Sequence, residues 1–130
     1  MSKTGKFPVR ARLPKVYGVM GRWAGGGAAS NMTKVTGRGI SSVAYNSATG
    51  AYLITFEETH PQLVAISITC GTALTTTVQN VCNYDPAQYS ATAGTLPIFI
   101  TDVATPTAQD LLTTEEISIV AWFADTAVTQ

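Results

Sequence analysis

The fold is decided by the stretch from Gly39 to Phe56, which has the sequence GISSVAYNSATGAYLITF. Its middle, Asn46–Gly50, is a cluster of turn-forming residues, and both flanks are rich in residues that favour strands. In the second flank Tyr52, Ile54 and Phe56 occupy alternate positions, so they share one face of an extended chain. The stretch therefore predicts a β-hairpin.

Strands are predicted on both sides of this turn and along the rest of the chain. The first arm of the hairpin extends over Lys34–Tyr45 with bends at Gly37 and Gly39, and the second over Ala51–Glu57. Turns at Pro61, at Gly71 and at Asp85-Pro86, and a loop over residues 86–95, separate the later elements. Those elements are strands at Leu63–Cys70, Thr75–Tyr84, Leu96–Val103 and Ile117–Ala124, with one helical turn at Thr107–Leu112.

Alternation within these strands predicts which side chains face the core. Val64, Ile66, Ile68 and Cys70 are expected to share one face of their strand, and Ile117, Ile119 and Phe123 are expected to face inward. Trp122 and Phe123 are assigned to core and interface. Strands joined by short turns, with one apolar face each, predict an all-β fold, an antiparallel β-sandwich or barrel of about six to seven strands.

The N-terminal part has a different character. Pro8 and Pro14 oppose helix, so residues 1–22 are expected to form an extended basic arm. Residues 23–31 include three consecutive glycines and are expected to be a flexible linker or an ordinary loop. This divides the chain into an arm and linker over residues 1–31 and a β-sandwich body over residues 32–130.

The composition suits a protein that packs against other proteins. The chain has 130 residues, of which 45% are hydrophobic and only 12% charged, about half the usual charged share. A surface with so little charge favours association. No apolar run is long enough for a membrane helix, and no apolar segment typical of a secretory signal follows the first basic residues.

The two signs of charge are separated along the sequence. All eight lysines and arginines occur up to Arg38, and all eight acids occur from Glu57 onward. The two parts should attract each other, within one chain or between copies. Nucleic acid is the alternative partner for a basic arm, but these bases are single and separated by apolar residues, which favours docking on protein. The predicted docking residues are Phe7, Arg10, Arg12, Leu13 and Tyr17.

No arrangement of residues predicts catalysis, a cofactor or a metal. His60 is the single histidine and precedes a proline, so it is assigned to a turn. The pairs Glu57-Glu58 and Glu115-Glu116 are expected to be solvated strand ends, because adjacent strand residues point to opposite faces; a loop Ca²⁺ site is the alternative. The spacing of Cys70 and Cys82 fits no zinc motif. Buried free thiols are expected, with a bridge between neighbouring strands as the alternative.

Part of the chain resembles a family of viral proteins. The stretch Gly39–Phe56 contains Gly-x-x-Ser-Val and then Gly-x-Tyr-x-x-Thr, and the sequence HPQL follows at His60–Leu63. Together with ATPTAQDL at residues 104–111, this is similar to short virion proteins of tailed bacteriophages. The resemblance covers about half of the chain and leaves the basic N-terminal residues out.

The resemblance implies a β-sandwich protein of the virion that decorates and cements the phage head. It also implies a location on the capsid surface after synthesis in the host cytoplasm. The expected partners are the major capsid protein and copies of the chain itself, as a dimer or trimer, without a membrane or nucleic acid. The alternatives are a tail or baseplate component, a genome-packaging coat protein, and a carbohydrate-binding module with Tyr84, Tyr89 and Trp122 as candidate aromatics.

Overall fold

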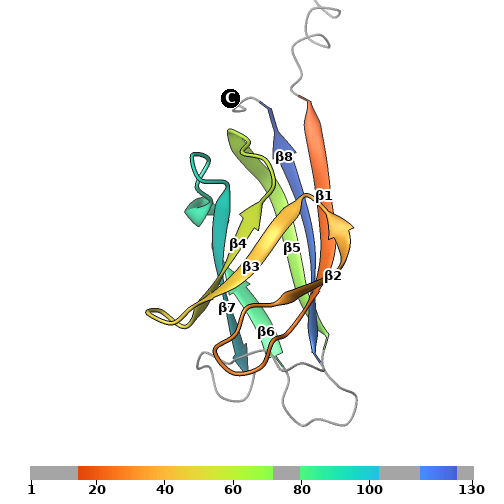
Figure 1. Cartoon of the computed structure of the whole chain (residues 1–130). Coiled ribbons are helices and arrows are strands. Elements are labelled where there is room, and N and C mark those ends of the chain that lie inside the picture. The colour runs from red at the N-terminus through yellow and green to blue at the C-terminus, as the bar shows by residue number, and fades with distance from the viewer. Residues whose placement is uncertain (1–14, 72–79, 103–114, 126–130) are drawn as a thin grey trace, which may run out of the picture.

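The computed structural model describes residues 15–71, 80–102 and 115–125, which form a β-sandwich of two four-stranded antiparallel sheets (Figure 1). The strand order is β2-β1-β8-β5 in the first sheet and β3-β4-β7-β6 in the second. The predicted all-β sandwich is confirmed. The elements are β1 (Val16–Ala24), β2 (Thr33–Arg38), β3 (Ile40–Asn46), β4 (Ala51–Phe56), β5 (Gln62–Gly71), β6 (Asn80–Tyr84), the 3₁₀ turn η1 (Pro86–Gln88), β7 (Thr95–Asp102) and β8 (Glu116–Ala124).

The strand β1 corrects the predicted arm. It pairs with β8 along its whole length, from Val16 opposite Ala124 to Ala24 opposite Glu116. The inward side chain of Trp23 is only 4% exposed, so this strand belongs to the body of the sandwich. The two prolines that suggested an arm are Pro8 and Pro14, and residues 1–14 lie outside the described residues.

The glycine-rich stretch is a loop between two paired strands. Residues 25–32 connect β1 to β2, its antiparallel neighbour, and the Gly25 N–H donates to the Glu115 carbonyl at 2.9 Å. Of the two readings left open by the sequence, the ordinary loop is correct. The predicted boundary between arm and body at residue 31 therefore falls inside the first sheet.

The predicted bend at Gly39 is the point where the chain changes sheets. β2 ends at Arg38 in the first sheet and β3 begins at Ile40 in the second. Gly39 has φ +91°, a left-handed conformation that side chains rarely adopt. A Cβ there would also lie 2.3 Å from Cγ1 of Val19, so both the backbone conformation and the available space require glycine.

The hairpin from β3 to β4 is confirmed. Its turn is closed by the Gly50 N–H, which donates to the Asn46 carbonyl at 2.8 Å, and by the Ala48 N–H, which donates to Asn46 Oδ1 at 3.0 Å. Tyr52, Ile54 and Phe56 all point into the core, as their alternation predicts.

The predicted alternation of side chains along β5 is wrong at one residue. Its register with β8 shifts between Leu63 and Ala65, so Val64 is an extra residue in a β-bulge. Val64, predicted to share a face with Ile68, is 50% exposed, whereas Ile68 is buried. Alternation alone does not reveal the bulge.

The later elements follow the predicted order. Asp85 caps η1 by accepting the Ala87 N–H, and β7 and β8 begin within one residue of their predicted starts. The described part of the strand predicted at Thr75–Tyr84 is β6. The helical turn predicted at Thr107–Leu112 lies outside the described residues.

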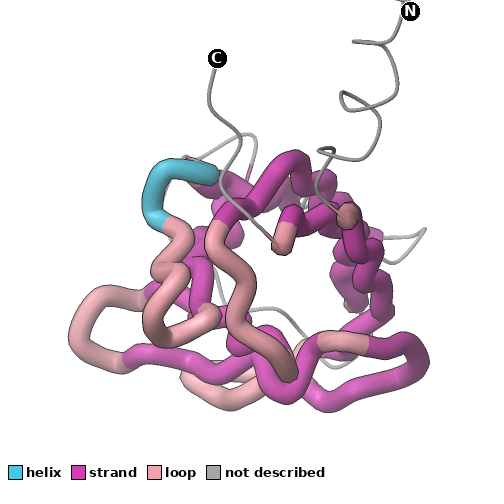
Figure 2. Tube along the Cα trace, turned by 90° about the horizontal axis from the view of Figure 1, so that it is seen from above, coloured by secondary structure: helices cyan, strands magenta, loops and turns pink. Residues whose placement is uncertain are grey.

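The core fills the space between the two sheets, and Figure 2 shows the strands surrounding it when the molecule is viewed along the sandwich. β8 contributes the predicted inward set, all at most 1% exposed. At one end of the core the rings of Phe56, Tyr89 and Phe123 contact one another, with the centroids of Phe56 and Phe123 4.8 Å apart.

Candidate assembly surface

The outward side of the first sheet carries exposed apolar side chains on β1, β8 and β5. Met20 on β1 lies opposite Val120 on β8, and Trp122 follows two positions further along β8. Met20 is 57% exposed and Trp122 45%, which is high for large apolar side chains. We call the following residues the apolar face: Val16, Met20, Val64, Val120 and Trp122.

The position of Trp122 depends on the glycine opposite it. Gly18 on β1 is its cross-strand partner, and a Cβ on Gly18 would lie only 2.6 Å from ring atom Cζ3. Two further ring atoms would be 3.0 Å from that Cβ. The indole ring therefore covers the backbone of β1 where no side chain projects. It presents an aromatic surface that the sheet itself holds in place.

Charged residues border this face, because Arg38 on β2 lies opposite Met20 and Arg22 follows Met20 by two positions on β1. Strand β5 has none, and Arg22 and Glu116 form an ion pair with Nε 2.9 Å from Oε1. This pair joins a base from the first part of the sequence to an acid from the second part. The expected attraction thus occurs within one chain at this position, although an exposed pair contributes little to stability.

The outward side of the second sheet is less apolar. Its exposed large apolar side chains are Phe99 and Val81, and Asn83 Nδ2 donates to Thr101 Oγ1 at 2.7 Å beside them. Asp102 is the only charged residue in the four strands of this sheet. The two outward sides are therefore both low in charge but differ in exposed apolar area.

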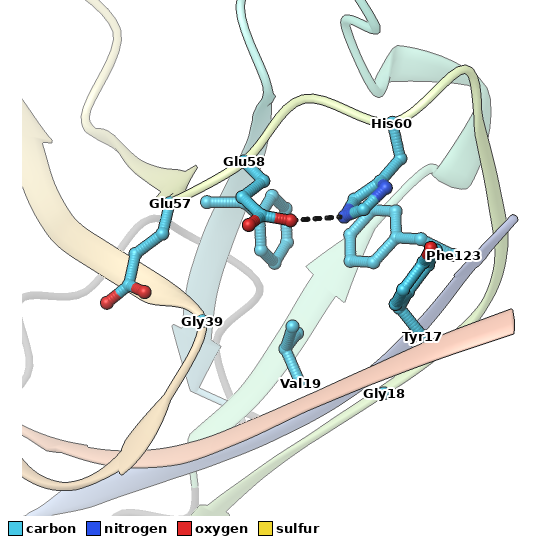
Figure 3. Close-up of a pocket in the computed structure, with 9 residues that line it drawn as sticks. Tyr17, Gly18, Val19, Gly39, Glu57, Glu58, His60 and Phe123 are labelled. Atoms are coloured by element: carbon cyan, nitrogen blue, oxygen red, sulfur yellow. Dashed lines mark ion pairs between the residues drawn. The ribbon is translucent and has the colours of Figure 1, made fainter. Parts of the chain in front are cut away.

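A small pocket of about 140 Å³ opens at the end of the sandwich where β1 begins (Figure 3). His60 is buried there between Tyr17 and Phe123, with ring centroids 5.1 Å apart on both sides. His60 Nε2 lies 3.7 Å from Glu58 Oε1. The backbone of His60 is held by the Tyr89 hydroxyl, which donates to the His60 carbonyl at 2.9 Å. His60 lies in the turn before β5, as expected, and its ring is also part of the pocket wall.

The two glutamate pairs have different environments. Glu57 and Glu58 are exposed, as predicted. Glu115, predicted to be solvated, is buried at 3% exposure, and its Oε2 accepts a hydrogen bond from Asn80 Nδ2 at 3.0 Å. The prediction is wrong because Glu115 lies just before β8 rather than at a free edge, and Asn80 reaches it from the second sheet. Glu116 pairs with Arg22 instead.

The two cysteines are free thiols, as predicted, but both are partly rather than fully buried. Burial raises the pKa of the Cys70 thiol to about 11, with a smaller contribution from the negative charge of Glu115. Burial likewise raises the pKa of Cys82 to about 12, and the nearby Cys70 adds to the effect. Both thiols are protonated and poorly nucleophilic at neutral pH.

Of the predicted docking residues, Phe7, Arg10, Arg12 and Leu13 lie outside the described residues. Tyr17 lies on β1, half-exposed, and stacks on His60 at the pocket. Its role in docking stays a prediction.

The three candidate aromatics for carbohydrate binding do not share a surface. The hydroxyls of Tyr84 and Tyr89 donate to the backbone carbonyls of Ile66 and His60, and their rings pack against the core. Only Trp122 is well exposed, and it lies on the other sheet from Tyr84. The sequence did not predict Met20 as a surface residue. Gly18, Met20 and Arg22 are spaced by two residues, so they share one face of β1, but this signal applies only if β1 is a strand.

Among residues 15–71, 80–102 and 115–125, no three His, Cys, Asp or Glu side chains gather as they would around a metal ion. The same part of the chain has no helix long and apolar enough to cross a membrane. Comparison with known proteins returns no match: no family model, curated protein or solved structure is significantly similar to the chain.

Proposed function

We propose that the chain is a non-catalytic structural protein of a phage virion, a decoration or cement protein that binds the head shell through protein–protein contacts. The observation that carries the proposal is the apolar face. Isolated exposed apolar residues are ordinary, but five on one side of one sheet mark a surface that is covered in the assembled state.

The apolar face has the features of a binding surface. Tryptophan is enriched among the residues that dominate interface energies, and methionine adapts to a partner's shape. Met20 and Trp122 are diagonal neighbours across β1 and β8, because Gly18 lies opposite Trp122 and Val120 lies opposite Met20. On a symmetric shell the same contact is repeated many times, so modest affinity per copy is enough for stable decoration.

The edges of both sheets support contacts with copies of the chain and with the major capsid protein. Edge strands are normally protected by charge. Of the four edge strands, β2 carries Lys34 and Arg38, but β3, β5 and β6 carry no charged residue. Assembly into dimers or trimers on the shell would cover such edges.

Co-sedimentation with empty head shells of the phage that encodes the chain tests this proposal. The wild type should bind saturably, and the double variant Met20→Lys/Trp122→Lys should bind at least about tenfold more weakly, because two charges would be buried in the contact. The matched control is Phe99→Lys on the second sheet, which should bind like the wild type. Absence of binding to shells refutes the decoration role, and binding to purified tails instead would support the tail alternative.

A further inference from the structure

The pocket at the end of the sandwich is suited to a single positively charged side chain. Its wall is aromatic, formed by the Tyr17–His60–Phe123 stack and by Phe56. Figure 3 shows Glu58 above the space and Val19 and Gly39 below it. A guanidinium group stacks on aromatic faces and its methylene stem packs on apolar walls, so both parts of an arginine would find a matching surface.

The carboxylates at this pocket are available for an ion pair with a cation. Glu57 and Glu58 lie on its rim, and the Glu58 side chain is 76% exposed. Among the described residues, no lysine or arginine forms an ion pair with either carboxylate. Asp125 adds a third acid at the same end of the sandwich, where its Oδ1 accepts the Lys15 N–H at 3.0 Å.

The sequence supplies the matching cations nearby. Residues 1–14 contain Lys3, Lys6, Arg10 and Arg12 and no acid. They join the body at Lys15, two residues before Tyr17 of the pocket. Arg12 is separated from Lys15 by at most about 11 Å of extended chain. The segment that carries these bases is thus joined to the body at the end of the sandwich where the acids lie.

We infer that the pocket receives an arginine of residues 1–14 from a neighbouring copy, with Glu57 and Glu58 as its ionic partners. The inference rests on the proposed assembly function and specifies one contact in it. A neighbour is taken as the source because the proposed function is assembly between copies, and the charge swap below distinguishes a neighbour from the same chain. Isologous exchange of such contacts would close a symmetric oligomer.

A charge-swap experiment on the full chain tests the contact. One variant reverses the bases, Arg10→Glu/Arg12→Glu, and the other reverses the rim, Glu57→Arg/Glu58→Arg. Each variant alone should associate at least about tenfold more weakly than the wild type at low salt, measured by sedimentation equilibrium, because like charges then face each other. An equimolar mixture should recover wild-type association within about threefold, since each variant complements the other.

The other outcomes overturn the inference. If the mixture associates no better than each variant alone, the contact lies within one chain. If each variant associates like the wild type, the pocket binds no cation. A wild type that stays monomeric at low salt also refutes it. Circular dichroism melts confirm that both variants fold, as expected for exposed positions such as Glu57 and Glu58. Binding to head shells is measured in parallel. If the wild type binds shells and the swaps do not change association, only the pocket contact is refuted. If the wild type does not bind shells, the proposed function is refuted.

Discussion

The two sheets have the same number of strands and bury equivalent inner sides, but their outward sides differ. Of nine exposed large apolar side chains among the described residues, five form the apolar face of the first sheet, whereas only Val81 and Phe99 lie on the second sheet. The second sheet combines these two with hydrogen-bonded polar residues such as Asn83 and Thr101. Since a low charge is common to both, exposed apolar area and not charge distinguishes the side that we propose binds the shell.

The same contrast occurs between neighbours on β8. Phe123 points inward, is fully buried and stacks on His60, whereas Trp122 points outward over Gly18. Phe123 therefore stabilises the fold, whereas Trp122 is exposed on the side that we propose binds the shell. The predictions below separate these two roles.

The largest effect is expected at Phe123. Phe123→Ala should lower the free energy of unfolding by about 3–5 kcal/mol, because it leaves a cavity among Phe56, His60 and Tyr89. Trp122→Ala should lower it by about 1 kcal/mol or less, since that side chain is half-exposed. Urea unfolding measures both. Equal losses would contradict the assignment of separate roles.

The next effect concerns the polar link between the sheets. Asn80→Ala should lower the free energy of unfolding by about 1–3 kcal/mol, because the buried Glu115 carboxylate loses a donor. The matched control is Asn83→Ala on the same strand, whose bond to Thr101 is exposed and contributes about 0.5 kcal/mol or less. If both variants unfold at the same urea concentration, burial of the Asn80–Glu115 bond is not what stabilises it.

A comparable or smaller effect on stability is expected at Gly18. Gly18→Ala places a Cβ against Trp122 and should cost about 1–2 kcal/mol, together with weaker shell binding, because the ring must move. At Gly71 a Cβ would meet only the Glu116 carbonyl at 3.7 Å, so Gly71→Ala serves as the control and should leave both properties unchanged. Normal shell binding by Gly18→Ala would show that the position of Trp122 does not matter.

The last effect appears only at alkaline pH. The folded-state pKa values of Cys70 and Cys82 are raised from 9.0 to about 11 and 12. The stability that the neutral thiols contribute is fully present below pH 9 and is lost as pH rises from 9 to 12, because the unfolded chain ionises first. The free energy of unfolding should therefore fall more steeply above pH 9 in the wild type than in Cys70→Ala/Cys82→Ala. Identical slopes would mean that the thiols are more accessible than the structure shows.

Much of the fold could be predicted from the sequence because its local signals agree. The turn residues at Asn46–Gly50 and Asp85-Pro86, and the alternation in β4 and β8, locate most strands and their inward sides. Strand β1 was missed because prolines before it and glycines after it outweigh its own weak alternation, and its pairing with β8 joins distant parts of the chain. No local sequence pattern predicts such pairing.

The candidate surface was less predictable than the fold. Trp122 could be assigned to core or interface from β8 alone, but Met20 joins it only through the pairing of β1 with β8. The bulge that exposes Val64 and the burial of Glu115 by Asn80 likewise depend on contacts between strands far apart in sequence. Alternation specifies which side chains share a face of one strand, not which strands lie together.

Hydroxyl-radical footprinting of the chain, free and bound to empty head shells, tests the central claim most directly. It reports the oxidation of Met20 and Trp122 on the first sheet and of Phe99 on the second in the same sample. We predict that binding protects Met20 and Trp122 severalfold and leaves Phe99 as reactive as in the free protein, where all three are exposed. Protection of Phe99 with Met20 and Trp122 still oxidised would contradict the claim that the first sheet is the docking side.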